Sequence, residues 1–172
     1  RMPTVPWKNE DGEHEPVTNY YRLMTSRGLS ISGQRTLQPS IMVKRAGHID
    51  GVFSIVLKDL SLLPKIVGMW SSVPFDFFIK TTGKGDFRDD LARQMPLPET
   101  SKKLDRAIKY RALLLNSLTT PYADLWEDSW QDAFTKDTWT KNDPRLSADT
   151  AFADLSPEWT WDTPLRTRYA RR

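Results

Sequence analysis

The chain has 172 residues, of which 38% are hydrophobic and 27% charged, and its formal net charge is +3 at pH 7. It contains no cysteine, which excludes disulfides and thiolate metal sites. Its two histidines, His14 and His48, lie far apart in sequence, and neither has a metal-ligand spacing. No apolar run reaches 18 residues and no signal peptide is visible, so we expect a cytoplasmic protein with no membrane partner.

The charges are distributed unevenly along the chain. Residues 22–58 carry six basic side chains against one acidic side chain, a local net charge of +5. Residues 121–165 carry three basic side chains against ten acidic ones, a local net charge of −7. The first region suits contact with a phosphate backbone, which would repel the second.

The first half of the chain predicts several short strands. Residues 1–19 are polar and rich in proline, and we interpret them as a linker or a loop that leads into the first strand. We expect Trp7 to anchor this segment to a core. Short apolar runs predict strands at 20–24 and 40–43. The β-branched run at 51–57, which Gly51 opens, predicts a third and buried strand.

A long amphipathic helix is predicted after this strand. Asp59 and Ser61 offer N-cap oxygens, and Pro64 suits a first helical turn. Apolar side chains at three- and four-residue spacing then form one face over roughly five turns, namely Leu62, Leu63, Ile66, Val67, Trp70, Val73, Phe77 and Phe78. Pro74 lies inside this pattern and should kink or divide the helix. At helical spacing we expect the aromatic residues to be core rather than base-stacking groups, which concerns Trp70, Phe75, Phe77 and Phe78.

The helix should end in the glycine-containing segment 81–85, whose lysine suits the carbonyl end of a helix. Residues 91–98 are expected to return as a short extended piece, in which Pro96 and Pro98 exclude a long central strand.

Residues 20–98 together resemble the TaqI-like C-terminal target-recognition, or specificity, domain of type IIG adenine-N6 DNA methyltransferases. The segment 70–78, WSSVPFDFF, matches the "LNS…FDF" core of that family, with Ser71 where the family has asparagine. The segment 91–98, LARQMPLP, matches its closing "LxxxPxP" strand. Two upstream segments fit the same pattern, Tyr21–Arg27 and Arg35–Ile41.

This resemblance implies a module that presents loops to the major groove of double-stranded DNA, in restriction–modification or phage defence. Methyl transfer from S-adenosylmethionine would belong to a separate catalytic methyltransferase domain, or to another part of the same polypeptide. The glycine-rich cofactor loop and the Asn/Asp-Pro-Pro-aromatic motif of that domain do not occur in this sequence. We therefore expect no catalytic residue, no cofactor site and no metal site in this chain, and a longer parent polypeptide.

The candidate DNA-binding residues are basic side chains set among glycines and small hydroxyl residues, a mixture that allows close approach to a phosphate backbone. The turn at 44–48 is the best local candidate, because lysine and arginine neutralise phosphate and arginine can bind guanine through two hydrogen bonds. The complete set is Arg27, Arg35, Lys44, Arg45, His48, Lys80, Lys84 and Arg88. The alternatives are a solvated hairpin at 25–39, an ordinary loop at 80–88, and a His48 that only forms hydrogen bonds within its loop.

Residues 99–120 predict a second helix that Ser101 caps. Its predicted apolar face comprises Leu104, Ile108, Arg111, Leu114 or Leu115, and Leu118. The other faces are basic, and we interpret them as solvated, with phosphate contact as the alternative; they carry Lys102, Lys103, Arg106 and Lys109.

Residues 121–172 form an acidic tail with five tryptophans, Trp126, Trp130, Trp139, Trp159 and Trp161. We expect it to be extended apart from a helical turn or two at 125–134. Five tryptophans are costly to leave in water, so the tail should wrap the body or pack against another domain with its acids facing solvent. The chain as a whole is then α+β: short strands, a long central helix, a second helix and an extended acidic tail rich in tryptophan.

Two other functions stay open. The acidic tail could serve as a protein–protein scaffold, or mimic DNA and occupy the basic region. The cluster Asp86, Asp89 and Asp90 could hold a divalent cation for a nuclease, although the lysine or glutamate that such a site usually adds is missing.

Overall fold

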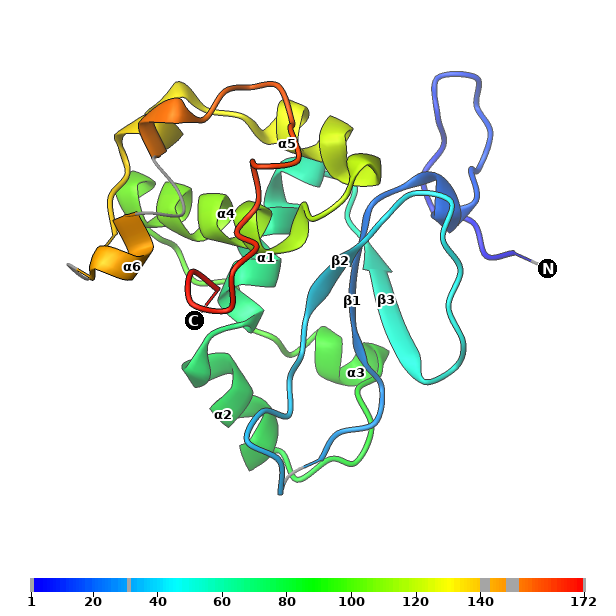
Figure 1. Ribbon diagram of the computed structural model, residues 1–172. Helices are drawn as coiled ribbons and strands as arrows, with labels where there is room; N and C mark the ends of the chain where they lie inside the picture. Colours follow the sequence, from blue (N-terminus) through cyan, green and yellow to red (C-terminus); the bar gives the residue numbers. More distant parts are fainter. Residues whose placement is uncertain (1, 31, 140–142, 148–151, 172) are drawn as a thin grey trace. The chain divides into compact units, whose positions relative to one another are not determined.

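Figure 1 shows the structure, a computed structural model, which describes residues 2–30, 32–139, 143–147 and 152–171. The chain forms two compact units, Arg1–Pro98 and Glu99–Arg172. We call them unit 1 and unit 2. Unit 1 contains a sheet and helices, and unit 2 consists of helices and irregular segments, so the chain is an α+β protein as predicted.

Unit 1 is built on a three-stranded antiparallel sheet in the order β2-β1-β3. The strands are β1 (Arg22–Ser26), β2 (Ser40–Met42) and β3 (Val52–Val56). All three predicted strands are therefore present, with bounds shifted by one or two residues. β2 and β3 do not pair with each other, because β1 lies between them. The loop that connects them, residues 43–51, is called the hairpin loop below, a name for its place in the chain only.

The two faces of the sheet differ, because successive residues of a strand point to opposite sides. Leu23 and its register partner Ile41 are buried on the side of α1. Phe53 lies on the same side and contacts Phe87, whose ring packs on Trp70 of α1. Arg22 points to the opposite face, between its register partners on β2 and β3. All five residues of β3 are half-buried, whereas the sequence predicted a buried strand, because α1 packs mainly on β1 and β2.

The predicted long helix is divided in two, as Pro74 suggested. A short 3-10 turn, η2 (Leu60–Leu62), precedes α1 (Leu63–Trp70), and α2 (Val73–Thr81) follows at an angle of 74°. The Asp59 side chain accepts from Ser61 N and caps η2. Proline stands at the start of both helices, where its missing N–H breaks no helical hydrogen bond.

The bend ends the continuous apolar stripe that the sequence predicted. Phe75, Asp76 and Ile79 are the buried residues of α2. Val73 and Phe77 lie on its other side and are 70% and 66% exposed. The prediction that Phe77 is a core residue is therefore wrong, because α2 turns a different face inward than a straight continuation of α1 would.

The segment after α2 also differs from the prediction. Asp89–Ala92 forms a short helix, α3, so Leu91 does not begin an extended piece. Its first turn carries Asp89 and Asp90, and acidic side chains stabilise a helix N-terminus. Residues 93–98 follow without a strand among them.

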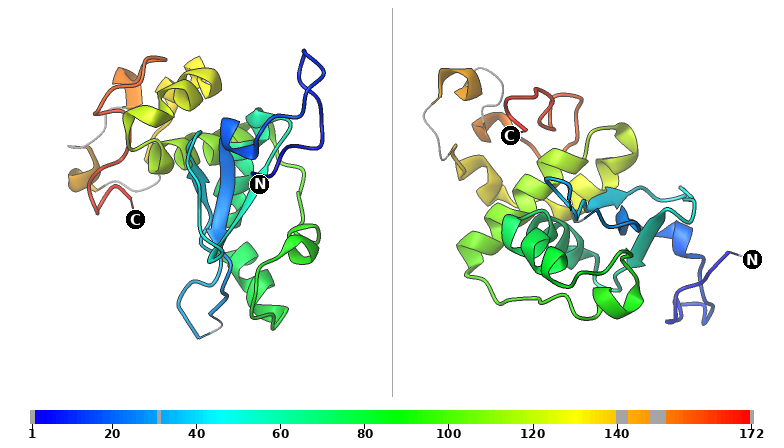
Figure 2. Two further views of the ribbon diagram at one scale, coloured as in Figure 1. Left: turned by 90° about the vertical axis from the view of Figure 1, so that its right-hand side faces the viewer. Right: turned by 90° about the horizontal axis from the view of Figure 1, so that it is seen from below.

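The N-terminal segment is a small hairpin rather than an open linker. Thr4 and Pro16 form an isolated β-bridge, and Val5 N donates to Glu15 O. A 3-10 turn, η1 (Val17–Asn19), leads into β1, and the Trp7 ring packs edge-on against Tyr20. The tip of this N-terminal hairpin projects from the sheet in Figure 1 and in both views of Figure 2.

Unit 2 is organised around α4 (Lys102–Asn116), which Ser101 caps by accepting from Leu104 N. The rest of the unit consists of η3 (Thr120–Tyr122), α5 (Ala123–Ser129), η4 (Asp132–Lys136), α6 (Pro144–Ser147) and η5 (Phe152–Asp154). The predicted extended tail is therefore largely a series of short helical turns. The buried residues of α4 are Tyr110, Ala112, Leu113 and Leu114, so the predicted apolar face is correct for Leu114 and wrong for Leu104, which is 51% exposed.

An aromatic cluster forms the centre of unit 2. Tyr110 of α4 stacks on Phe134 at 4.8 Å between ring centroids and meets Phe152 edge-on at 5.6 Å. Trp126 is fully buried beside Phe134 and donates from Nε1 to Ser156 O. Burial raises the pKa of the Tyr110 hydroxyl far above its usual range.

The tail tryptophans are mostly internal to unit 2. Trp126 is buried, Trp159 is half-buried and donates to Ser117 O, and Trp161 is 61% exposed under the Arg166 guanidinium. The guanidinium of Arg145 in α6 lies 3.8 Å from the centre of the Tyr169 ring. Most described acids of the tail are exposed, as predicted. Lys141 and Asp149, counted in the acidic region, lie outside the described residues.

Among the described residues no single helix has the length and apolarity needed to span a membrane. The segment Leu60–Trp70 passes that test only together with α2, and the two are bent by 74°.

Gly83, which follows α2, has a φ of +65° and open space around its missing side chain. We expect Gly83→Ala to lower the free energy of unfolding by roughly 1 kcal/mol, because a Cβ is strained in the left-handed region. Gly85→Ala is the matched control, since its surroundings are equally open and its φ is not positive. Urea unfolding of the two variants checks this, and equal stabilities would contradict it.

Candidate nucleic-acid interface

The eight predicted DNA-binding residues all lie in unit 1, in three separate groups. Lys44, Arg45 and His48 are on the hairpin loop. Lys80 is on α2 and Arg35 is in the loop packed beside it, and the remaining three, Arg27, Lys84 and Arg88, lie among aspartates. The structure therefore does not bring the eight together into one basic surface patch.

The third group is engaged in ion pairs. Arg27 pairs with Asp50 and lies 3.7 Å from a carboxylate oxygen of Asp86. Arg88 contacts the same Asp86 oxygen at 2.9 Å, and Lys84 pairs with Asp90. The hydrogen bond from Lys84 lowers the pKa of the Asp90 carboxyl. Arg27 connects the loop at 83–90 to the end of β1, and Lys84 and Arg88 pair with aspartates inside that loop. These pairs reduce the charge that the three cations offer to an outside ligand.

The same ion pairs bear on the alternative of a nuclease site. Asp86 and Asp90 are paired as described, and Asp89 contacts Arg93 at 2.8 Å. Within the described ranges, no three His, Cys, Asp or Glu side chains are grouped so that they could hold a metal ion.

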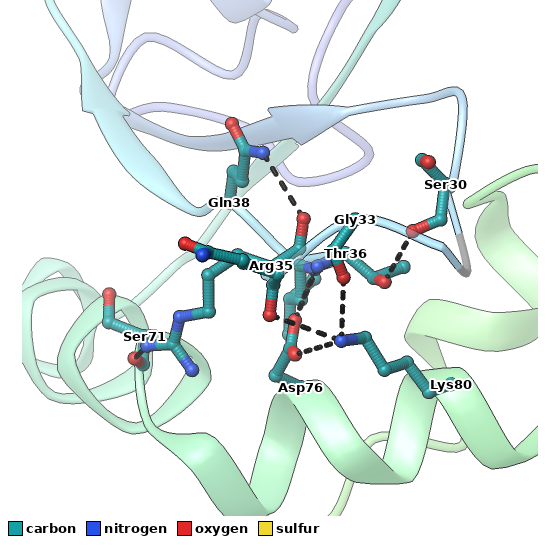
Figure 3. A network of polar contacts seen from close by, with 10 residues as sticks. Ser30, Gly33, Arg35, Thr36, Gln38, Ser71, Asp76 and Lys80 are labelled. Carbon is teal, nitrogen blue, oxygen red and sulfur yellow. Dashed lines mark hydrogen bonds and ion pairs between the residues drawn. The ribbon is translucent and has the colours of Figure 1, made fainter.

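A buried carboxylate that the sequence analysis did not single out organises the second group. Asp76 of α2 is 4% exposed, and its Oδ1 accepts the backbone N–H groups of Thr36 and Leu37, both at 2.7 Å. Figure 3 shows these bonds, together with Lys80, which lies 3.4 Å from Asp76 Oδ2 and donates to the carbonyls of Gly33 and Gln34. The signal in the sequence was a single acid inside the apolar run of α2.

The surroundings of Asp76 favour its ionised form. Burial alone would raise its pKa, but the two backbone N–H groups and Lys80 outweigh burial, and the pKa is lowered. The carboxylate therefore stays charged and fixes the loop between β1 and β2 to α2.

Arg35 connects this loop to the end of α1. Its Nη2 donates to the carbonyl of Ser71, the residue that caps α1, where a cation is favourable (Figure 3). The Ser71 hydroxyl itself donates to Val67 O at 2.7 Å. Arg35 and Lys80 line a shallow pocket of about 390 Å³ with the exposed Val73 and Phe77.

The hairpin loop is the most exposed of the three sites. Lys44, Arg45 and His48 are all exposed, and Ile49 beside them is 80% exposed. Arg45 has a φ of +65°, and its backbone N–H donates to Thr18 O at 2.6 Å. The loop lies on the opposite side of the sheet from α1 (Figure 1). This geometry suits contact with a ligand too large to enter a pocket.

Two residues of the loop also contact the body of unit 1. The Lys44 ammonium lies 4.8 Å from the centre of the Tyr21 ring. His48 hydrogen-bonds to Ser54 Oγ at 2.8 Å and to Ile49 O at 3.0 Å, as predicted for a histidine that forms hydrogen bonds in its loop.

Comparison with known proteins found no matching family model, no matching curated protein and no matching solved structure.

We expect Asp76→Ala to destabilise unit 1 by about 1–3 kcal/mol, because it leaves two buried backbone N–H groups without an acceptor. Asp89→Ala is the matched control: it removes an exposed carboxylate from an i,i+4 ion pair with Arg93, and little change is expected. Urea unfolding at pH 7 measures both, and equal effects would contradict the role of Asp76.

The contribution of Asp76 should depend on pH. Its folded pKa is lowered, so the stabilisation is present above its unfolded pKa of about 4 and is lost as the pH falls through the folded value. The stability difference between the original chain and Asp76→Ala should therefore be constant above about pH 5 and shrink towards pH 2. A difference that grows on acidification would contradict the assignment.

Proposed function

We propose that unit 1 is the DNA-recognition module of an adenine-N6 DNA methyltransferase, as the resemblance of residues 20–98 implies, and that the hairpin loop contacts duplex DNA. Methyl transfer would then occur in a separate domain that binds S-adenosylmethionine. The observation that carries the proposal is the grouping of Lys44, Arg45 and His48, three of the predicted DNA-binding residues, on one exposed loop.

The side chains of the hairpin loop suit both phosphate binding and the reading of base edges. Lys44 and Arg45 would neutralise phosphates, which supplies affinity without sequence information. Arg45 is also able to reach a guanine edge in the major groove, and the exposed Ile49 could contact a thymine methyl group.

The remaining predicted residues have other contacts that limit this role. Arg27, Lys84 and Arg88 are tied to aspartates, so their contribution to phosphate binding should be smaller than that of the hairpin loop. Arg35 and Lys80 hold the loop of residues 30–38 in place, and we assign them a supporting role.

The test is binding of the full chain to a mixed-sequence duplex across a series of salt concentrations, followed by fluorescence anisotropy. We expect Lys44→Ala with Arg45→Ala to weaken binding at low salt and to reduce the magnitude of the salt slope by about 1–2. Alanine and arginine are both L-residues, so the strain at the positive φ of position 45 is the same in the variant.

Lys102→Ala with Lys103→Ala is the matched control, because it removes two exposed charges from α4 in unit 2. It should change binding less than the hairpin-loop variant. Equal losses would indicate a diffuse charge effect and contradict a site on the loop, and absence of binding at low salt would contradict the proposal itself. Methyl transfer to DNA by this chain alone would disprove the separate catalytic domain.

A further inference from the structure

Unit 1 contains a second pocket that the proposed function does not use. It has a volume of about 590 Å³ and lies where the N-terminal hairpin, η1, the hairpin loop and β3 meet. This volume falls within the range of roughly 300–1,000 Å³ that is usual for small-molecule sites. The lining is mainly apolar, with Val5, Trp7, Val52 and Val56 among its members.

A buried arginine lines this pocket. Arg22 of β1 is 2% exposed, and its Nη2 donates to Ala46 O in the hairpin loop. Its Nε has no hydrogen-bond partner in the part of the chain that the structure describes. Burial lowers the pKa of Arg22, but a guanidinium keeps its charge at neutral pH.

Such a guanidinium requires more acceptors than the protein supplies. It has five N–H donors, and a buried cation without a counter-charge is costly. No carboxylate of the described residues forms an ion pair with Arg22. Asp89 is the only acid in the described lining of the pocket, and it is paired with Arg93.

Polar side chains beside Arg22 complete a site for an oxyanion. His48 Nε2 and Ser54 Oγ are 2.8 Å apart, and both residues line the pocket together with Thr18. Ser54 is on the same face of the sheet as Arg22, because its register partner Met24 lies two residues further along β1. His48 Nδ1 bonds to Ile49 O and Nε2 to Ser54 Oγ, so the Ser54 hydroxyl is able to donate to a carboxylate or phosphate when the imidazole is protonated and donates from both nitrogens.

We propose that this pocket binds a small organic anion. Its carboxylate or phosphate oxygens accept hydrogen bonds from the Arg22 guanidinium, and its apolar body lies against Trp7, Val52 and Val56. The apolar lining favours an organic molecule over a bare inorganic ion, which would leave that surface uncovered. This site shares His48 with the hairpin loop, but the proposed DNA contact is tested on the charges of Lys44 and Arg45, which do not line the pocket, so either proposal can fail without the other.

The test is titration of the full chain with three probes of similar size: benzoate, phenyl phosphate and the uncharged benzyl alcohol. At least one anion should bind at least about tenfold more tightly than benzyl alcohol, because a charge-assisted hydrogen bond is lost in the neutral probe. Comparing benzoate with phenyl phosphate identifies which oxyanion the site takes. Isothermal calorimetry measures the affinities, and the Arg22 Nε–H resonance in a nitrogen-15 NMR spectrum should shift on binding.

Arg22→Met keeps an unbranched apolar stem in the interior and removes the charge, and it should weaken anion binding at least about tenfold. Lys58→Met is the control in the same unit, exposed and outside the described lining of the pocket, and should leave binding unchanged. If Arg22→Met does not fold, the Nε–H shift and Ser54→Ala, which should also weaken binding, still decide the question. Equal affinity for benzyl alcohol and the anions, no binding at millimolar concentration, or full binding by Arg22→Met would overturn the proposal.

Discussion

The hydrogen bonds from Thr36 and Leu37 to the buried carboxylate of Asp76 are the constraint on which the rest of unit 1 depends. A loop that enters a protein interior must satisfy its backbone N–H groups, and here one ionised side chain of α2 satisfies two of them. Lys80 compensates the charge of Asp76 and binds two carbonyls of the same loop. The sheet and α2 are thereby joined by polar contacts as well as by packing.

Ion pairing also decides which basic side chains of unit 1 can contact an anionic ligand. The net charge of +5 over residues 22–58 counts every basic side chain equally. In the folded chain Arg27 compensates aspartates, Arg35 binds the end of α1, and Arg22 is buried beside a pocket. The hairpin loop presents Lys44, Arg45 and His48 to solvent together, and the proposed DNA contact rests on that grouping.

Unit 2 shows how an acidic segment can be part of a folded structure. Its aromatic side chains gather around Tyr110 and Phe134, while most described acids remain at the surface. Asp137, which is half-buried, contacts Arg111 of α4 at 2.5 Å. Because its tryptophans are mostly covered within unit 2, the tail is a structural part of that unit, which weakens the interpretation of the tail as a scaffold.

The sequence by itself determined the features that depend on neighbouring residues: the three strands, the caps at Asp59 and Ser101, and the break of the helix at Pro74. These follow from local backbone geometry and local hydrogen bonds. Only the tertiary structure decided that β3 is an edge strand, that Phe77 is exposed, and which cations are paired. Those outcomes depend on partners distant in sequence, as with Asp76 and Thr36, forty residues apart, and no local pattern encodes them.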